Sequence, residues 1–249
     1  MTPVLVAASA YGADLVRRVG HADLVHMVAG AGAAGLEIRR ELFAGEGTED
    51  LPALRALLEQ HKLFSVYSAP FELFGADGKF DREQIAMAME EAEQVGARYL
   101  KVSLGHFSAA SDLPKLLRYL SNAPTEVLLE NDQTPQGGRL EPIVSFLSLC
   151  TGNGVSFGMT FDMGNWRWNG IDPELAARTL APHIRYVHCK GVREDKGKLK
   201  AVPLQPQDAD WQSLFGYFPK GIMRAIEFPL VGADLEEVTR RHVAMLATV

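Results

Sequence analysis

The chain repeats one pattern along its whole length: a short apolar run followed by a stretch with helical periodicity. Short apolar runs indicate strands buried on both faces, which is typical of parallel sheets. The runs begin near Val4, Leu36, Leu63, Tyr99, Val127, Phe157, Ile184 and Ala225. Because eight strand–helix repeats in 249 residues favour closure over an open sheet, we predict a (β/α)8 TIM barrel, with residues 1–249 forming a single domain.

The segments between the runs support this interpretation. Helical patterns cover residues 51–58, 82–95 and 235–246. The segment Gly30–Gly35 matches G-x-G-x-x-G, but it ends a helical stretch and leads into the strand at Leu36, so we predict a helix terminus rather than a dinucleotide site. Two longer irregular segments, 71–79 and 192–208, follow strands and are expected on the face of the barrel where active sites form.

Composition excludes several classes of protein. The net charge of −6, without a basic run, argues against binding to nucleic acid or to an anionic membrane. No run approaches the ~18 apolar residues that a membrane span needs, and the apolar start of the chain lacks the basic segment of a signal peptide. Cys150 and Cys189 are too few for a disulfide framework, which predicts a reducing, cytoplasmic compartment. Homo-oligomerisation is left open.

Four ionisable residues stand near the ends of the last four apolar runs: Glu130, Asp162, His188 and Glu227. A charged group at the end of a buried strand is costly unless it is paired or binds a metal. The alternative is that each side chain simply turns into solvent. The regular order of all four on successive strands favours one shared site, with three carboxylates and one imidazole converging on a divalent cation.

These residues resemble the xylose isomerase-like sugar isomerase/epimerase superfamily. The resemblance rests on the segments 129–131, 160–162, 186–190 and 225–228, and the segment Gly35–Arg39 also fits. It implies a TIM barrel with a metal held by Glu130, Asp162, His188 and Glu227. It also implies that the two glutamates act as catalytic proton carriers. An oxygen-rich site of this kind favours Mn²⁺, Mg²⁺ or Co²⁺, with Zn²⁺ less favoured.

The sequence departs from the ketose 3-epimerase members of that superfamily in its substrate-binding positions. Asn165 stands where they have a histidine, and Gln136 where they have a second glutamate. Glu194, with Arg193 beside it, stands where they have a substrate-binding arginine. The resemblance therefore supports the metal site and not the substrate contacts of a ketose epimerase.

The residues predicted to bind substrate are Arg39, Lys101, Asn165, Trp166, Lys190 and Arg193. Strand alternation places the first two and Lys190 toward the site, while Trp166 could wall a sugar ring. Cations in excess of the metal ligands would suggest an anionic group on the substrate. The alternative is that Arg39 pairs with Glu37 or Glu41 and that Lys101 pairs with a metal ligand, which leaves no free cation.

The predicted function is a metal-dependent isomerase or epimerase acting on a small-molecule carbohydrate-type substrate: a sugar, keto sugar or sugar acid. One glutamate removes a proton next to a polarised carbonyl, and the resulting enediolate is reprotonated. Loss of a hydroxyl from the same intermediate would instead make a dehydratase or lyase of a cyclic polyol or a dehydroshikimate-like substrate. A barrel that binds carbohydrate without turnover is the third interpretation.

Overall fold

The computed structural model describes residues 2–43 and 49–249, and its centre is a closed barrel of parallel strands in the order β1-β10-β7-β6-β5-β4-β3-β2. The barrel strands are β1 (Val4–Ala7), β2 (Gly35–Arg39), β3 (Phe64–Phe74), β4 (Tyr99–Gly105), β5 (Glu126–Glu130), β6 (Gly158–Asp162), β7 (Ile184–Cys189) and β10 (Met223–Ile226). The predicted TIM barrel is confirmed, and all eight strands lie at the apolar runs.

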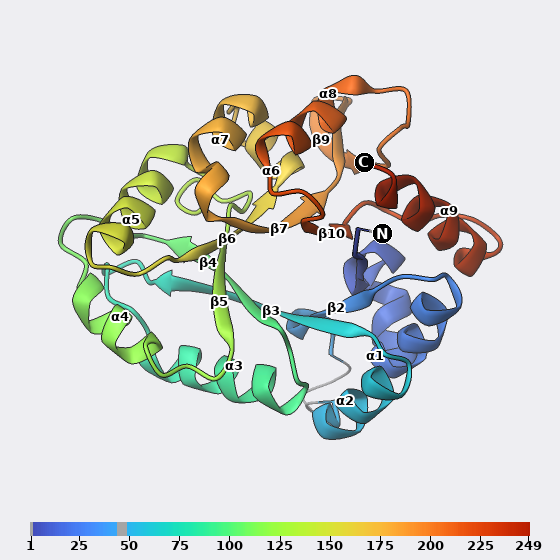
Figure 1. Cartoon of the computed structure of the whole chain (residues 1–249), viewed down its shortest axis with the longest axis horizontal. Coiled ribbons are helices and arrows are strands. Elements are labelled where there is room, and N and C mark those ends of the chain that lie inside the picture. The colour runs from blue at the N-terminus through green and yellow to red at the C-terminus, as the bar shows by residue number, and fades with distance from the viewer. Residues whose placement is uncertain (1, 44–48) are drawn as a thin grey trace.

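Helices surround the barrel (Figure 1). They are α1 (Ala13–Gly30), α2 (Leu51–Gln60), α3 (Arg82–Gln94), α4 (Leu113–Leu120), α5 (Leu140–Gly152), α6 (Met163–Trp168), α7 (Pro173–Leu180), α8 (Ala209–Ser213) and α9 (Leu235–Ala247). Asp50, Asp81, Asp112 and Asp234 accept backbone hydrogen bonds at the first turns of α2, α3, α4 and α9, so side-chain capping fixes where these helices begin. The glycine-rich motif is the end of α1 and the loop into β2, as predicted.

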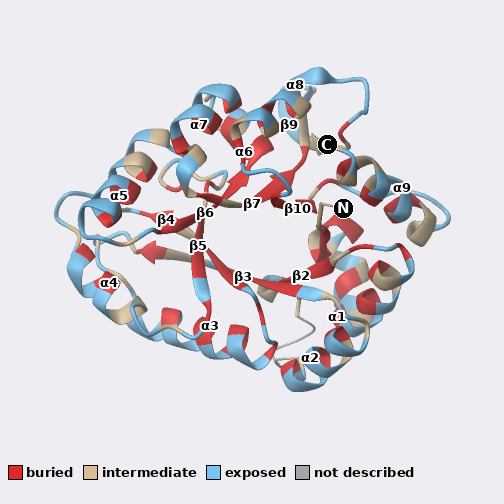
Figure 2. Cartoon of the chain, in the orientation of Figure 1, coloured by how far each residue is buried: buried red, intermediate tan, exposed pale blue. Residues whose placement is uncertain are grey.

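Apolar side chains pack on both sides of the strands. Figure 2 shows buried residues along the strands and on the inward faces of the helices, with exposed residues on the outward faces. The barrel interior holds a compact set of buried side chains, namely Leu5, Val66, Tyr99, Leu128, Tyr186, Met223 and Ala225. Both faces of each strand are therefore removed from water, which explains the continuous apolar runs.

Two segments differ from the expected irregular loops. The segment after β7 begins with an antiparallel hairpin, β8 (Gly191–Asp195) and β9 (Lys198–Val202), before the short helix α8. β3 continues to Phe74 through a register shift between Ser68 and Glu72. The segment 192–208 follows a barrel strand, as predicted, whereas residues 71–74 of the segment 71–79 belong to β3 itself. Among the described helices, none combines the length and apolar character that crossing a membrane requires.

Candidate metal centre and active site

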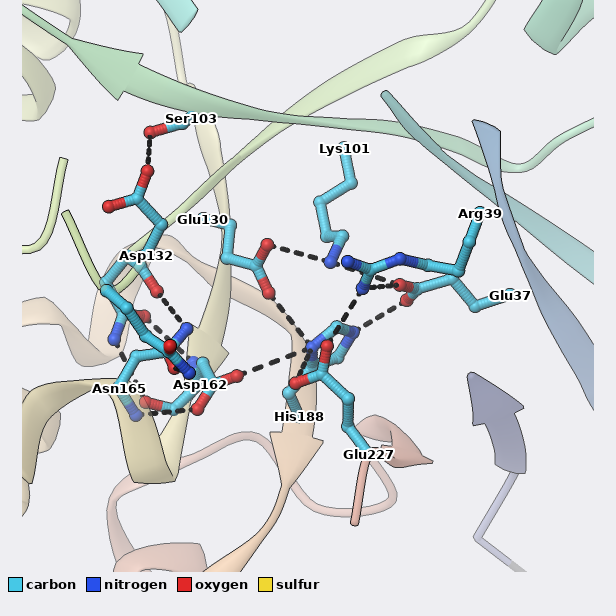
Figure 3. Close-up of polar contacts among 12 residues, drawn as sticks. Glu37, Arg39, Lys101, Ser103, Glu130, Asp132, Asp162, Asn165, His188 and Glu227 are labelled. Carbon is cyan, nitrogen blue, oxygen red and sulfur yellow. Dashed lines mark hydrogen bonds and ion pairs between the residues drawn. The ribbon is translucent and has the colours of Figure 1, made fainter. Parts of the chain in front are cut away.

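The four ionisable residues converge at one end of the barrel (Figure 3). Glu130 and Asp162 end β5 and β6, His188 lies near the end of β7, and Glu227 follows β10 directly. One potential ligand atom from each lies within 4.8 Å of all the others. Parallel strands end at the same rim of the barrel, so side chains far apart in sequence meet there.

His188 is oriented by Glu37, which extends from β2. The Nε2 atom of His188 lies 2.6 Å from the Oε2 atom of Glu37, and both side chains are fully buried. When Nε2–H donates to this carboxylate, Nδ1 is left as the free nitrogen of the ring. Nδ1 lies 2.9 Å from Glu130 Oε1, 2.9 Å from Glu227 Oε2 and 3.6 Å from Asp162 Oδ2.

Each carboxylate is anchored through one oxygen and faces this nitrogen with the other. Asp162 Oδ1 accepts from the backbone N–H groups of Gly164 and Asn165 at the start of α6, each at 2.8 Å. Glu130 Oε2 accepts from Lys101 at 2.8 Å, and Glu227 Oε1 accepts from Arg39 at 2.9 Å. The protein therefore fixes the orientation of all three carboxylates.

Three buried atoms at the centre make no hydrogen bond of good geometry within residues 2–43 and 49–249: Glu130 Oε1, Asp162 Oδ2 and His188 Nδ1. Their close neighbours are other ionisable groups, since His188 Nδ1 lies 2.9 Å from Glu130 Oε1 and Lys190 Nζ lies 2.8 Å from Asp162 Oδ2. A buried polar atom without a partner is costly and uncommon. Here the unsatisfied atoms come from three separate strands and face one another. A divalent cation would satisfy all of them, and three carboxylates with one imidazole are a suitable ligand set for Mn²⁺, Mg²⁺, Co²⁺ or Zn²⁺.

Three cations surround the carboxylates, and all of them are paired. Arg39 contacts Glu41 at 2.7 Å, Glu227 at 2.9 Å and Glu37 at 3.3 Å. Lys101, 1% exposed, lies 2.8 Å from Glu130 and 3.0 Å from Glu37. Lys190 Nζ lies 2.8 Å from both Asp162 Oδ2 and Glu227 Oε2. The structure thus shows the arrangement in which the cations neutralise carboxylates of the site.

These contacts determine how the groups ionise. Burial opposes ionisation of Glu130 and Glu227, yet the adjacent positive charges outweigh it, chiefly Lys101 for Glu130 and His188 and Lys190 for Glu227, so both pKa values are lowered. Burial and the charge of Glu227 raise the pKa of Asp162. Burial opposes protonation of His188, but Glu227 and Glu37 raise its pKa well above the ordinary value.

Three of the predicted substrate-binding residues have side chains engaged away from the converging carboxylates: one is buried in the core, one is exposed, and one binds the backbone. Trp166 is fully buried in α6 and packs against Phe161, with ring centroids 5.8 Å apart, so its ring faces the core. Arg193 is exposed on β8, opposite Lys200 of β9. The Asn165 side chain donates to the backbone oxygen of Asn131 at 2.8 Å and so ties the start of α6 to the end of β5.

Sequence reasoning did not identify Glu37 and Asp132 as part of the site. Strand alternation places Glu37 on the same face as Arg39, which was the available signal, but its partner His188 is 151 positions away in sequence. Asp132 follows Glu130 by two residues and accepts from the Ser103 hydroxyl at 2.5 Å. Neither contact is encoded in a local pattern.

Comparison with known proteins supports the fold. No protein-family model matches the sequence, and no curated protein matches it. Among solved structures, a xylose isomerase domain-containing protein from Salmonella typhimurium LT2 has a TM-score of 0.75 at 17% identity, covering 100% of this chain and 98% of that one. The probable 3-DHS dehydratase AsbF of Bacillus anthracis has a TM-score of 0.70 at 14% identity, covering 98% of each chain.

An epimerase has the same fold. The D-psicose 3-epimerase of Clostridium cellulolyticum H10, solved with D-tagatose, has a TM-score of 0.66 at 12% identity, covering 100% of this chain and 98% of that one. The IolI protein, solved with a bound zinc atom, has a TM-score of 0.68 at 14% identity, covering 100% and 95%. The chain therefore has the fold of the xylose isomerase-like TIM barrels, a fold found in both epimerases and a dehydratase.

Proposed function

We propose that this protein is a divalent-metal-dependent isomerase or epimerase that acts on a sugar or keto sugar through an enediolate. The observation that carries the proposal is the convergence of the four potential ligand atoms within 4.8 Å of one another, with each of the two glutamates also held by a cation. The epimerases among the solved structures of this fold add support.

Glu130, Asp162, His188 and Glu227 would hold the metal. A divalent cation supplies Lewis-acid polarisation of a carbonyl, which acidifies the neighbouring C–H group. Glu37 would hold His188 in the tautomer that leaves Nδ1 free for coordination, as second-sphere carboxylates do for many metal-binding histidines.

Glu130 and Glu227 are the proposed proton carriers. They reach the centre from β5 and from beyond β10, with β6 and β7 between them, so they flank a bound substrate from two sides. Their lowered pKa values keep both carboxylates ionised and able to accept a proton near neutral pH. Lys101 and Arg39 hold the outer oxygen of each glutamate, which directs the other oxygen inward.

Lys190 is the proposed donor to the developing oxyanion. Its side chain is 6% exposed, and its ammonium group lies against Asp162 and Glu227 at the centre. An ammonium group fixed in a buried site stabilises negative charge that develops on an oxygen during reaction. Arg39 and Lys101 act through the glutamates they hold and serve as positioning residues.

The test is solvent exchange catalysed by the metal-loaded protein. Keto sugars and cyclic polyols are incubated with it in D₂O and followed by NMR. Deuterium incorporation next to the carbonyl, with an isomer or epimer as product, supports the proposal. Formation of an enone assigns the site to a dehydratase instead, a chemistry that the fold also hosts. Ligand binding without exchange or product leaves only a carbohydrate-binding barrel and overturns the proposal.

A further inference from the structure

A cavity of about 270 Å³ opens beside Glu130, on the side of the barrel formed by β3, β4 and β5. Its lining includes Arg39, Ser68, Glu72, Ser103, Glu130 and Asp132. Because Glu130 is one of the four converging residues, a substrate that reached the centre from this side would extend into the cavity. The groups along its wall would then contact the part of the substrate remote from the metal centre.

A bulge in β3 places Glu72 in this wall. Ser68 pairs with Lys101 and Glu72 pairs with Ser103, so four positions along β3 are matched by only two along β4. Bulges of this kind re-aim side chains next to active sites. Gln136 donates to Glu72 Oε1 at 2.7 Å, which holds the carboxylate in place while 26% of the side chain stays exposed.

The hydrogen-bond donors of this wall are already committed to Asp132. The Ser103 hydroxyl donates to Asp132 Oδ2 at 2.5 Å, and the Thr134 hydroxyl donates to Oδ1 at 2.6 Å. The Thr134 hydroxyl also accepts from the Gly137 backbone N–H at 2.9 Å. These groups can therefore mainly accept hydrogen bonds from a ligand, so the ligand must be the hydrogen-bond donor.

One further polar side chain is available. Ser68 lines the cavity, and the residue is 4% exposed. A serine hydroxyl at a cavity wall can both donate to and accept from a bound polar group. The Ser68 hydroxyl therefore points to a polar occupant of the cavity.

The charge of the lining is unfavourable for an anion. Within the described residues, Arg39 is the cation in the cavity wall, and it already contacts three carboxylates. Glu72, Asp132 and Glu130 are all acidic. Outside the lining, His106 Nε2 lies 3.8 Å from Glu72 Oε2. A phosphate or carboxylate group in this cavity would face three carboxylates, with Arg39 already paired, and like charges placed together at a binding surface are strongly disfavoured.

We propose that Glu72 is a specificity-determining residue, which selects a hydrogen-bond-donating hydroxyl or ammonium group at the end of the substrate remote from the metal and rejects a phosphate there. The inference rests on the proposed function, because it assumes that the carbonyl end of the substrate occupies the metal centre. It excludes sugar phosphates that carry the phosphate at the far end.

Three ketoses that differ at one position test this directly: D-fructose, 6-amino-6-deoxy-D-fructose and D-fructose 6-phosphate. Dissociation constants are measured by ligand-observed NMR on the Mg²⁺-loaded protein, which detects weak binding without turnover. The variants are Glu72→Gln and, as a control, Glu93→Gln. Glu93 is exposed on α3, so its change removes the same charge outside the cavity.

The wild-type protein should bind the amino ketose and fructose at least tenfold more tightly than the phosphate. Glu72→Gln should reduce the ratio of the dissociation constants of the ketose phosphate and the amino ketose at least fivefold, while the dissociation constant of fructose changes by less than threefold. Glu93→Gln should leave that ratio unchanged. Phosphate binding as tight as fructose, equal effects of the two variants, or no binding of any ketose overturns the inference.

Two further measurements separate this failure from failure of the proposed function. Metal content of the wild-type protein is determined by mass spectrometry, and exchange in D₂O is followed with neutral ketoses. If the protein binds metal and catalyses exchange, but Glu72→Gln does not change the relative binding of the ketoses, the proposed function stands and Glu72 is excluded as a determinant of specificity. Absence of metal binding would remove both.

Discussion

The role of Glu37 in metal binding can be tested by Glu37→Gln. The amide keeps a carbonyl oxygen that can accept from His188 Nε2–H at the present 2.6 Å contact, so the variant removes the charge and preserves the shape. A carboxylate on one side of an imidazole lies roughly 6 Å from a divalent cation on the other side, and at an effective dielectric constant of about 20 this attraction is worth about 5.5 kcal/mol.

Part of that energy is recovered because Lys101 and Arg39, which also contact Glu37, can strengthen their contacts with other carboxylates. We therefore expect metal affinity to fall about 10–100-fold, the range found for second-sphere carboxylates. The measurement is a competition titration of Mn²⁺ against a chelating dye. Thermal unfolding of the metal-free protein, run alongside, checks that the variant is folded.

Glu41→Gln is the matched control. Glu41 contacts Arg39 at 2.7 Å but is 32% exposed. Glu41→Gln therefore removes one negative charge beside the same arginine, but at a position that does not contact His188. The affinity for metal should change less than threefold. Wild-type affinity in folded Glu37→Gln, or an equal loss in both variants, would refute the assignment of Glu37 as the residue that orients His188.

Four further outcomes are expected. His188→Ala should lower the metal content measured after reloading, and equal near-zero occupancy of this variant and the wild type would contradict the metal site. Glu130→Gln and Glu227→Gln should each reduce kcat more than binding, since each removes a proton carrier; a metal-bound variant with wild-type kcat would exclude that residue. Because the pKa of His188 is raised well above its ordinary value, a proton on the ring competes with metal, so metal affinity should increase as the pH rises through the neutral range toward that raised pKa, by up to about tenfold per unit, and a flat titration would contradict this. Gly164→Ala should lower kcat at least tenfold, because a Cβ there would lie 2.7 Å from Lys190 Cγ and displace its ammonium group; unchanged kinetics would show that Lys190 tolerates the shift.

The barrel was predictable because its strands are buried on both faces. That burial requires continuous apolar runs, which are visible in the sequence without knowledge of the partner strands. The convergence of Asp162 and His188 followed from the same logic, since parallel strands end at one rim and the two residues pair directly in the register of β6 and β7. Cytoplasmic location stays a prediction, and homo-oligomerisation stays open.

The placement of other residues depended on features that have no local signal. The residues after Asp162 form a helix that turns Trp166 into the core. The hairpin after β7 leaves Arg193 exposed. Glu72 reaches the cavity only because a bulge shifts the register of β3. The positions of Trp166 and Arg193 were decided by the path of the chain after a strand, and that of Glu72 by an irregularity within a strand. Apolar periodicity gives no information about either.

The charges at the centre constrain the chemistry of the site. Five carboxylates, those of Glu37, Glu41, Glu130, Asp162 and Glu227, contact the cations Arg39, Lys101 and Lys190, so two negative charges remain when His188 is neutral. A divalent cation would bring the total to zero. The proton removed from a neutral sugar passes to Glu130 or Glu227, so the total is unchanged while negative charge moves from that carboxylate to the enediolate oxygen. The metal and Lys190 would stabilise the charge in its new position. An anionic group at the reacting end would instead add a negative charge, and all three of these cations are already paired. The paired cations therefore favour a substrate that is neutral at the reacting end, in agreement with the acidic wall around Glu72.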